Sequence, residues 1–116
     1  MNRSTPGRLA ALVALAAALS PLGAQQNTIE IHAKRFEFSP SEITLKKGQP
    51  VTLSLISDDV PHSLLVEGLG INVAAVKGHA TTAQVTPQKT GDFSGRCGRF
   101  CGTGHGRMKF VVHVTE

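Results

Sequence analysis

Hydrophobic and polar residues alternate along most of the chain beyond residue 28, and this alternation predicts β-strands. A period of two is typical of a strand with one buried face, and no stretch there shows the helical period of 3.6 residues. Turn sequences such as KGQP at 47–50 and PQKTG at 87–91 separate the segments. The predicted strands cover residues 29–32, 43–45, 51–55, 62–66, 71–76, 82–86, a segment around Phe93, and 110–114.

These seven or eight short strands follow one another at intervals of about 8–12 residues, which is typical of a Greek-key β-sandwich or barrel. We therefore expect an all-β fold. The chain contains five Phe but no Trp or Tyr, so its core has to be built from Phe and aliphatic side chains. Residues 25–116 contain no linker, repeat or low-complexity segment, and we expect them to form one domain.

The N-terminal segment has the pattern of a secretory signal peptide. Arg3 and Arg8 precede an apolar run, LAALVALAAAL at 9–19, and the sequence SPLGA at 20–24 ends it. The run is too short to span a bilayer. We expect residues 1–24 to be a signal peptide and 25–116 to be a periplasmic or secreted domain without a transmembrane segment. An uncleaved membrane anchor is the alternative.

The charge of the exported domain excludes one class of partner. Loss of Arg3 and Arg8 leaves ten of the 12 basic residues against 8 acidic ones, a net charge of +2. Such a small excess is not the basic patch of a nucleic-acid-binding protein, and we expect no nucleic-acid partner.

The sequence CGRFCGTGHGRM at 97–108 carries the chemistry of the chain. It places both cysteines, a histidine and a methionine at the spacing C-x3-C-x3-H-x2-M, as Cys97, Cys101, His105 and Met108. Thiolate, imidazole and thioether groups are soft to borderline ligands, which select copper over magnesium or calcium. The intervening glycines let the backbone fold tightly around an ion. We expect a copper-binding loop anchored between two strands.

A further ligand is expected from outside this loop. His62, in the sequence DDVPHSL, begins a predicted strand after a turn. Because the ends of neighbouring strands meet at one end of a small sandwich, His62 is the candidate to complete the site. We expect Asp58 or Asp59 to accept the free ring N–H of His62.

Two other interpretations of the loop remain open. Cysteines in an exported chain indicate a disulfide, although a bond between Cys97 and Cys101 would close a loop too short to stabilise the fold much. A tetrahedral zinc site of His62, Cys97, Cys101 and His105 is also chemically sensible, with Met108 then filling the core. We expect the remaining histidines, His32, His79 and His113, to lie at the surface.

From DDVPHS through CGRFCGTGHGRM the chain resembles the binuclear CuA domain of cytochrome c oxidase subunit II, which nitrous oxide reductase shares. The resemblance covers roughly residues 42 to 114 and implies a cupredoxin fold. The C-x3-C-x3-H-x2-M signature, with a histidine on an earlier strand, is present in full. It is a specific signature, because the loop of a mononuclear blue-copper protein has a single cysteine.

The resemblance implies a ligand set for two copper ions. Cys97 and Cys101 would each bridge both ions, His62 would bind one and His105 the other. Met108 would be a weak ligand to one ion and the backbone carbonyl of Arg99 to the other. The pair would carry one electron. Since every copper position has a protein ligand, no position is open for a substrate, and we expect no enzymatic activity of the chain alone.

The chain also departs from subunit II. We expect no counterpart of the family's transmembrane hairpin, because the segment ahead of the domain has the pattern of a signal peptide. Arg99 stands where the family has a glutamate that reaches a metal at the interface with the catalytic subunit. No Trp or Tyr serves as a contact for cytochrome c, and Leu64 stands where an aromatic residue commonly follows His-Ser. We therefore expect a standalone, monomeric electron carrier whose partner is cytochrome c or a component of a terminal oxidase or reductase.

Two alternative functions use the same ligands. One is copper storage or delivery, and the other is an accessory subunit of a terminal oxidase or reductase. The basic residues beside the site are interpreted as a rim for an acidic redox partner or, equally, as a solvated face. They are Arg96, Arg99, Arg107 and Lys109.

Overall fold

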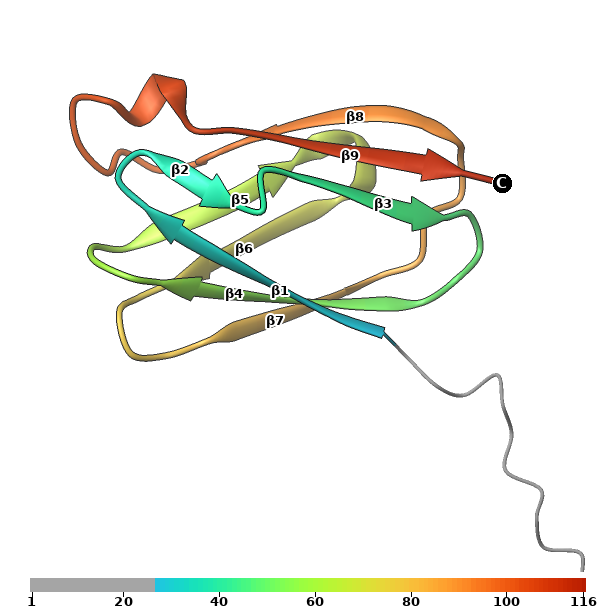
Figure 1. Cartoon of the computed structure of the whole chain (residues 1–116), viewed down its shortest axis with the longest axis horizontal. Helices are drawn as coiled ribbons and strands as arrows, with labels where there is room; N and C mark the ends of the chain where they lie inside the picture. Colours follow the sequence, from blue (N-terminus) through green and yellow to red (C-terminus); the bar gives the residue numbers. More distant parts are fainter. Residues whose placement is uncertain (1–26) are drawn as a thin grey trace, which may run out of the picture.

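The computed structural model describes residues 27–116, which form two β-sheets packed face to face (Figure 1). The predicted signal peptide, residues 1–24, lies outside the described residues. Two short 3₁₀ turns, η3 (Glu67–Leu69) and η4 (His105–Arg107), interrupt the strands. No helix in the described part is long and apolar enough to cross a membrane. The strands are β1 (Asn27–Lys34), β2 (Glu37–Ser39), β3 (Glu42–Lys46), β4 (Val51–Ser57), β5 (His62–Val66), β6 (Ile71–Ala75), β7 (Thr81–Val85), β8 (Gly91–Arg96) and β9 (Lys109–Thr115).

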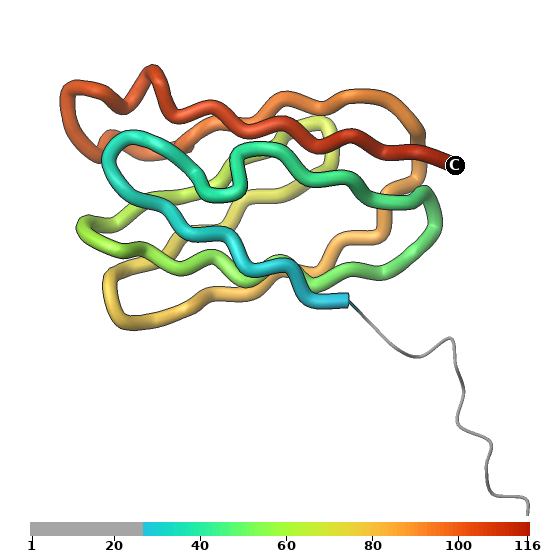
Figure 2. The backbone as a smooth tube through the Cα atoms, in the orientation of Figure 1, coloured from blue at the N-terminus to red at the C-terminus, as the bar shows by residue number. Residues whose placement is uncertain are grey.

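The strand order explains which loops meet. One sheet has the order β2-β1-β4-β7 and the other β3-β9-β8-β5-β6, with β1/β4 and β3/β9 parallel and the other pairs antiparallel. Strands β1, β4, β6 and β8 consequently all finish at one end of the sandwich (Figures 1 and 2). We call this end, made of segments 35–36, 58–61, 76–80 and 97–108, the cysteine end.

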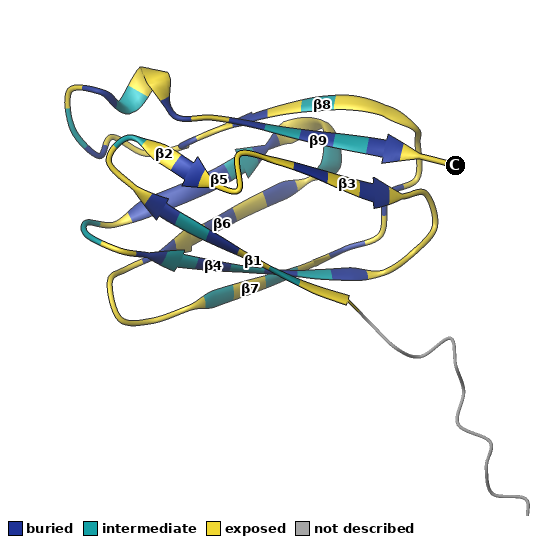
Figure 3. Cartoon of the chain, viewed as in Figure 1, coloured by how far each residue is buried: buried dark blue, intermediate teal, exposed yellow. Residues whose placement is uncertain are grey.

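The alternation seen in the sequence becomes the inner faces of the two sheets, as the burial pattern in Figure 3 shows. In β4 every second residue is buried, from Val51 to Ser57. Phe38 of β2 and Phe110 of β9 pack edge to face across the two sheets, with ring centroids 5.7 Å apart. Full burial of a side chain such as Phe110 contributes about 1.5–3 kcal/mol. The hydrophobic core therefore joins the first sheet to the strand that follows the cysteine loop.

The structure confirms the predicted fold class and each predicted strand, and it adds one. The described residues form nine strands, because β2 was not predicted. This strand has three residues, of which only Phe38 is buried, so it is too short to show an alternating pattern.

Two of the histidines expected at the surface form ion pairs there. The ring of His113 on β9 lies 2.7 Å from Asp92 of β8 and 2.8 Å from Glu42 of β3, so it joins three strands. Hydrogen bonds that the His113 ring donates to Glu42 and then to Asp92 raise the pKa of His113 above 6.5. His32 is held in the same way by Asp58 and Glu30, at 2.9 and 3.2 Å. His79 is exposed in the 76–80 loop.

His113→Gln should destabilise the fold in acid more than in base. A raised histidine pKa means that the ion pairs stabilise the folded state below pH 6.5 and lose this effect as the pH rises through the higher folded-state pKa. Urea unfolding at a pH of about 5.5 and of about 8.5 should show a larger loss at the lower pH. His79→Gln is the matched control, and an equal loss at both values for His113→Gln would contradict the role of the ion pairs.

Candidate metal centre

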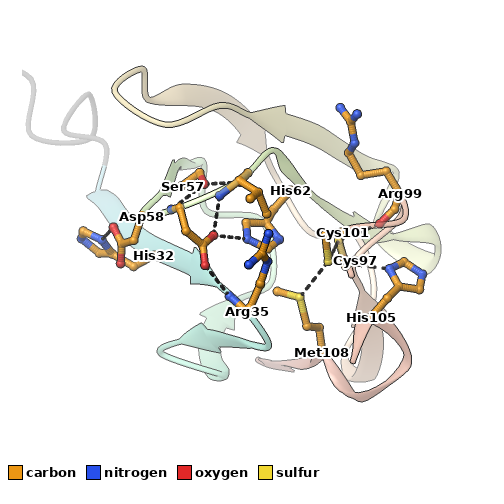
Figure 4. A network of polar contacts seen from close by, with 12 residues as sticks. His32, Arg35, Ser57, Asp58, His62, Cys97, Arg99, Cys101, His105 and Met108 are labelled. Atoms are coloured by element: carbon orange, nitrogen blue, oxygen red, sulfur yellow. Dashed lines mark hydrogen bonds and ion pairs between the residues drawn. The ribbon is translucent and has the colours of Figure 1, made fainter. Parts of the chain in front are cut away.

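The candidate site forms where two connections meet at the cysteine end. His62 is the first residue of β5, directly after the β4–β5 connection, and the other candidates lie in the loop from β8 to β9. The ligand atoms of His62, Cys97 and Cys101 all lie within 4.8 Å of one another. Figure 4 shows the ring of His62 facing the sulfur atoms of this loop.

The remaining predicted ligands surround the two cysteines. The sulfur of Cys101 lies 3.6 Å from that of Cys97, 3.4 Å from Met108 Sδ and 3.8 Å from His105 Nδ1. The thiol of Cys97 donates to the carbonyl oxygen of Arg99 at 3.1 Å. All six residues predicted from the sequence are therefore brought together.

Most of this cluster is removed from water. His62 and Met108 have no exposed surface, and Cys97 and Cys101 are 1% and 7% exposed. Burial, and then the contact with Cys97, raise the pKa of the Cys101 thiol above its usual range. His105 is half-buried at the outer edge of the cluster. A metal that binds here has to displace the thiol protons, and it would be bound in a nonaqueous environment.

Asp59 fixes the orientation of His62. Its Oδ1 lies 2.7 Å from His62 Nε2, and its Oδ2 accepts from the Arg35 amide at 2.9 Å. Burial alone would raise the pKa of Asp59, but the Arg35 amide, the His62 ring and the Val60 amide outweigh it and lower this pKa to about 2. An ionised Asp59 can only accept, so Nε2 carries the ring proton.

The other ring nitrogen of His62 is consequently free to bind a metal. Nδ1 is buried and has no hydrogen-bond partner among the described residues. A buried polar atom without a partner costs free energy, and few remain in folded proteins without a reason. The sequence prediction left the choice between two aspartates open. The structure selects Asp59, since Asp58 pairs with His32.

A hairpin far away in the sequence closes the cysteine loop, and no sequence signal indicated it. The ring of Phe36, between β1 and β2, packs directly against Gly104 and against Gly102, where an added Cβ would lie 2.8 Å from the ring. Gly102 has a φ of 137°, a conformation that favours glycine. The guanidinium of Arg107 lies 5.8 Å from the centroid of the same ring. The hairpin therefore contacts the loop through Phe36, and it contacts Asp59, the support of His62, through the Arg35 amide.

The start of the loop is fixed by the strand that carries His62. The amide of Gly98 donates to the hydroxyl of Ser63, a buried β5 residue, at 2.9 Å. Ser63 and His62 are neighbours in sequence, so one strand positions both a candidate ligand and the cysteine loop. The sequence did not indicate this contact. A serine next to His62 fits a strand equally well whether or not its hydroxyl binds the cysteine loop.

The donor set fits copper. Two thiols, two imidazoles, a thioether and a carbonyl oxygen within one buried cluster are the soft to borderline ligands that copper prefers. A zinc site would leave the Met108 contact unused, since a thioether is a poor zinc ligand. Both cysteines are free thiols in this structure.

Comparisons with known proteins point in the same direction. A family model described as a cupredoxin-like domain matches residues 7–112. Cytochrome c oxidase subunit 2 of Thermus thermophilus is 32% identical over 101 residues, which cover 87% of this chain and 75% of that protein. A second such sequence from Thermus thermophilus is covered over 60% of its length.

Two further similarities concern a shorter segment of the chain and the fold. A probable cytochrome c oxidase subunit 2 of Streptomyces avermitilis is 41% identical over 72 residues, which are 62% of this chain and 23% of that protein. The periplasmic domain of subunit II of cytochrome oxidase from Bradyrhizobium japonicum matches with a TM-score of 0.71. The match has 19% identity and covers 78% of this chain and 84% of that one, so it shows the shared fold.

Gly104→Ala should loosen the cysteine loop, because the new methyl group would overlap the ring of Phe36. We expect a loss of about 1–3 kcal/mol in the free energy of unfolding, measured with urea. Gly106→Ala is the matched control in the same loop, since no atom lies within 4 Å of its added Cβ. Equal losses for the two variants would show that the Phe36 contact does not stabilise the loop.

Proposed function

The chain belongs to the family of cupredoxin-like domains, as a relative of cytochrome c oxidase subunit II, and from this premise we propose that it is an exported electron-transfer protein with a binuclear copper centre. The observation that carries the proposal is the convergence of two cysteines, two histidines and a methionine in one largely buried cluster. The unpartnered Nδ1 of His62, directed by Asp59, is the feature of that cluster that calls for a metal.

Each group has a role in holding the copper pair. Cys97 and Cys101 would supply the two thiolates shared by both ions. His62 would bind one ion and His105 the other, while Met108 and the carbonyl of Arg99 would be the weaker ligands. When bound, such a pair takes up and releases one electron at a time.

The surrounding residues keep these ligands in place. Ser63 holds the Gly98 amide, Phe36 packs on the glycines of the loop, and Asp59 holds the ring of His62. Because protein interiors are close-packed, ligands fixed in this way can move little when the charge of the site changes. Small movement is what an electron-transfer site needs.

The burial of the thiols supports electron transfer over copper delivery. A delivery protein has to present its ligands to a receiving partner, whereas Cys97 and Cys101 are 1% and 7% exposed. We also propose that residues 1–24 direct export to the periplasm or beyond, and that residues 25–116 are the copper domain. Its function would then be that of a carrier serving an oxidase or reductase rather than of an enzyme.

The test is the copper content and the electron paramagnetic resonance spectrum of the oxidised, copper-loaded protein. We expect two copper ions per chain and a signal from one unpaired electron shared by two copper nuclei. Cys97→Ser should abolish the shared signal, because only one bridging thiolate would remain. A single copper per chain, or an unchanged spectrum in Cys97→Ser, would refute the binuclear assignment.

Asp59→Asn should weaken copper binding by about 10–100-fold, because a carboxylate that orients a histidine ligand contributes about that much to metal affinity. Asp58→Asn is the matched control, since Asp58 pairs with His32 instead of His62. Copper affinity is measured by competition with a chelator of known strength. Equal losses in the two variants would contradict the positioning role of Asp59.

A further inference from the structure

The exposed large hydrophobic side chains of the described part of the chain lie at the cysteine end. They are Phe100, 74% exposed between the two cysteines, and Val76, 46% exposed directly after β6. Val76 is adjacent to Ala75, which pairs with His62 across β5 and β6. Single exposed apolar residues are common, but their confinement to the loops around one site indicates a contact surface.

Phe100 lies beside a candidate ligand. Its ring centroid is 5.9 Å from that of His105, with the rings tilted by 37°. His105 is half-buried, whereas His62 is fully buried beneath the loops. Phe100 therefore covers the side of the cluster that is nearest to solvent.

The same end presents basic side chains that have no acidic partner in the described part of the chain. Lys77, Arg99 and Arg107 are exposed, and none of them forms an ion pair within residues 27–116. From residue 93 to residue 115 the chain contains no acidic residue. The two aspartates of this end are engaged, Asp58 with His32 and Asp59 with His62.

A hollow beside the cysteine loop is also lined by basic side chains. Arg96 and Lys109 face each other across β8 and β9, although Arg96 also contacts Glu67 at 3.2 Å. Like charges opposite one another in a sheet are unfavourable on their own. Arg96 and Lys109 line this hollow, which has a volume of about 230 Å³, together with Ser94, Gly95, Phe110 and Val111. An acidic side chain from another protein would relieve this repulsion.

We propose that the cysteine end docks the acidic face of a redox protein, with Phe100 and Val76 as apolar contacts and Lys77, Arg99 and Arg107 as ion-pairing residues. The proposal rests on the electron-transfer function proposed above, because the surface surrounds the candidate copper ligands. A partner with an acidic face is favoured by charge complementarity, which chiefly speeds association and selects the partner.

The test is a nuclear magnetic resonance titration of the ¹⁵N-labelled, copper-loaded, reduced protein. The probe is cytochrome b5, an acidic haem protein, and the opposite-charge probe is a basic cytochrome c. We expect cytochrome b5 to shift the amide signals of segments 76–80 and 97–108, with binding that weakens as salt rises from about 20 to about 200 mM. Basic cytochrome c should bind at least about tenfold more weakly.

Charge-reversal variants locate the surface. Lys77→Glu with Arg107→Glu should weaken cytochrome b5 binding by about tenfold. Lys46→Glu with Lys47→Glu makes the same change in net charge at the opposite end and should have an effect of less than about twofold. Phe100→Ala should weaken binding severalfold, whereas Phe100→Leu, which keeps an apolar side chain, should retain most of it.

The outcomes separate this proposal from the function on which it rests. Copper content and the shared-electron signal are measured first on the same preparation, and their absence would overturn the electron-transfer function. If the signal is present but both probes bind equally, or the two charge-reversal pairs have equal effects, the docking surface is overturned and the copper centre stands.

Discussion

The hydrogen bond between Asp59 and His62 is the contact on which the candidate centre depends. It leaves the proton on the nitrogen that faces away from the cysteines, so the other nitrogen is available to a metal. The carboxylate is kept ionised by two backbone amides as well as by the histidine. One of those amides belongs to Arg35, so the hairpin between β1 and β2 controls the chemistry of a residue that begins β5.

The sequence was sufficient for every strand except β2 and for the candidate donor groups, because these leave local patterns. Alternation along β4 and β9 reflects one buried face, and the spacing of Cys97, Cys101, His105 and Met108 reflects a single short loop. The surroundings of the loop could not be predicted in this way. The contact of Phe36 with Gly104 joins residues that are distant in sequence, and it depends on β2, a strand with one buried residue.

The same limit applies to the surface around the centre. The basic residues beside the loop were evident from the sequence, but the exposure of Phe100 and Val76 was not, since a hydrophobic residue in a small domain is expected to be buried. Lys77 was also missed, because only the pairing of the strands brings its loop to the cysteine end. Function here combines local motifs with neighbours that only the topology supplies.

The position of β8 and β9 in their sheet has a consequence for the lifetime of any bound ion. The two strands pair with each other, β9 also with β3 and β8 also with β5, so neither is an edge strand. Local opening events are most frequent where few backbone hydrogen bonds must break. Freeing both ends of the cysteine loop would break ladders in the middle of the sheet. Escape of an ion by that route would therefore be about as rare as unfolding of the entire domain, and the amides next to the loop would exchange with deuterium on the same slow timescale.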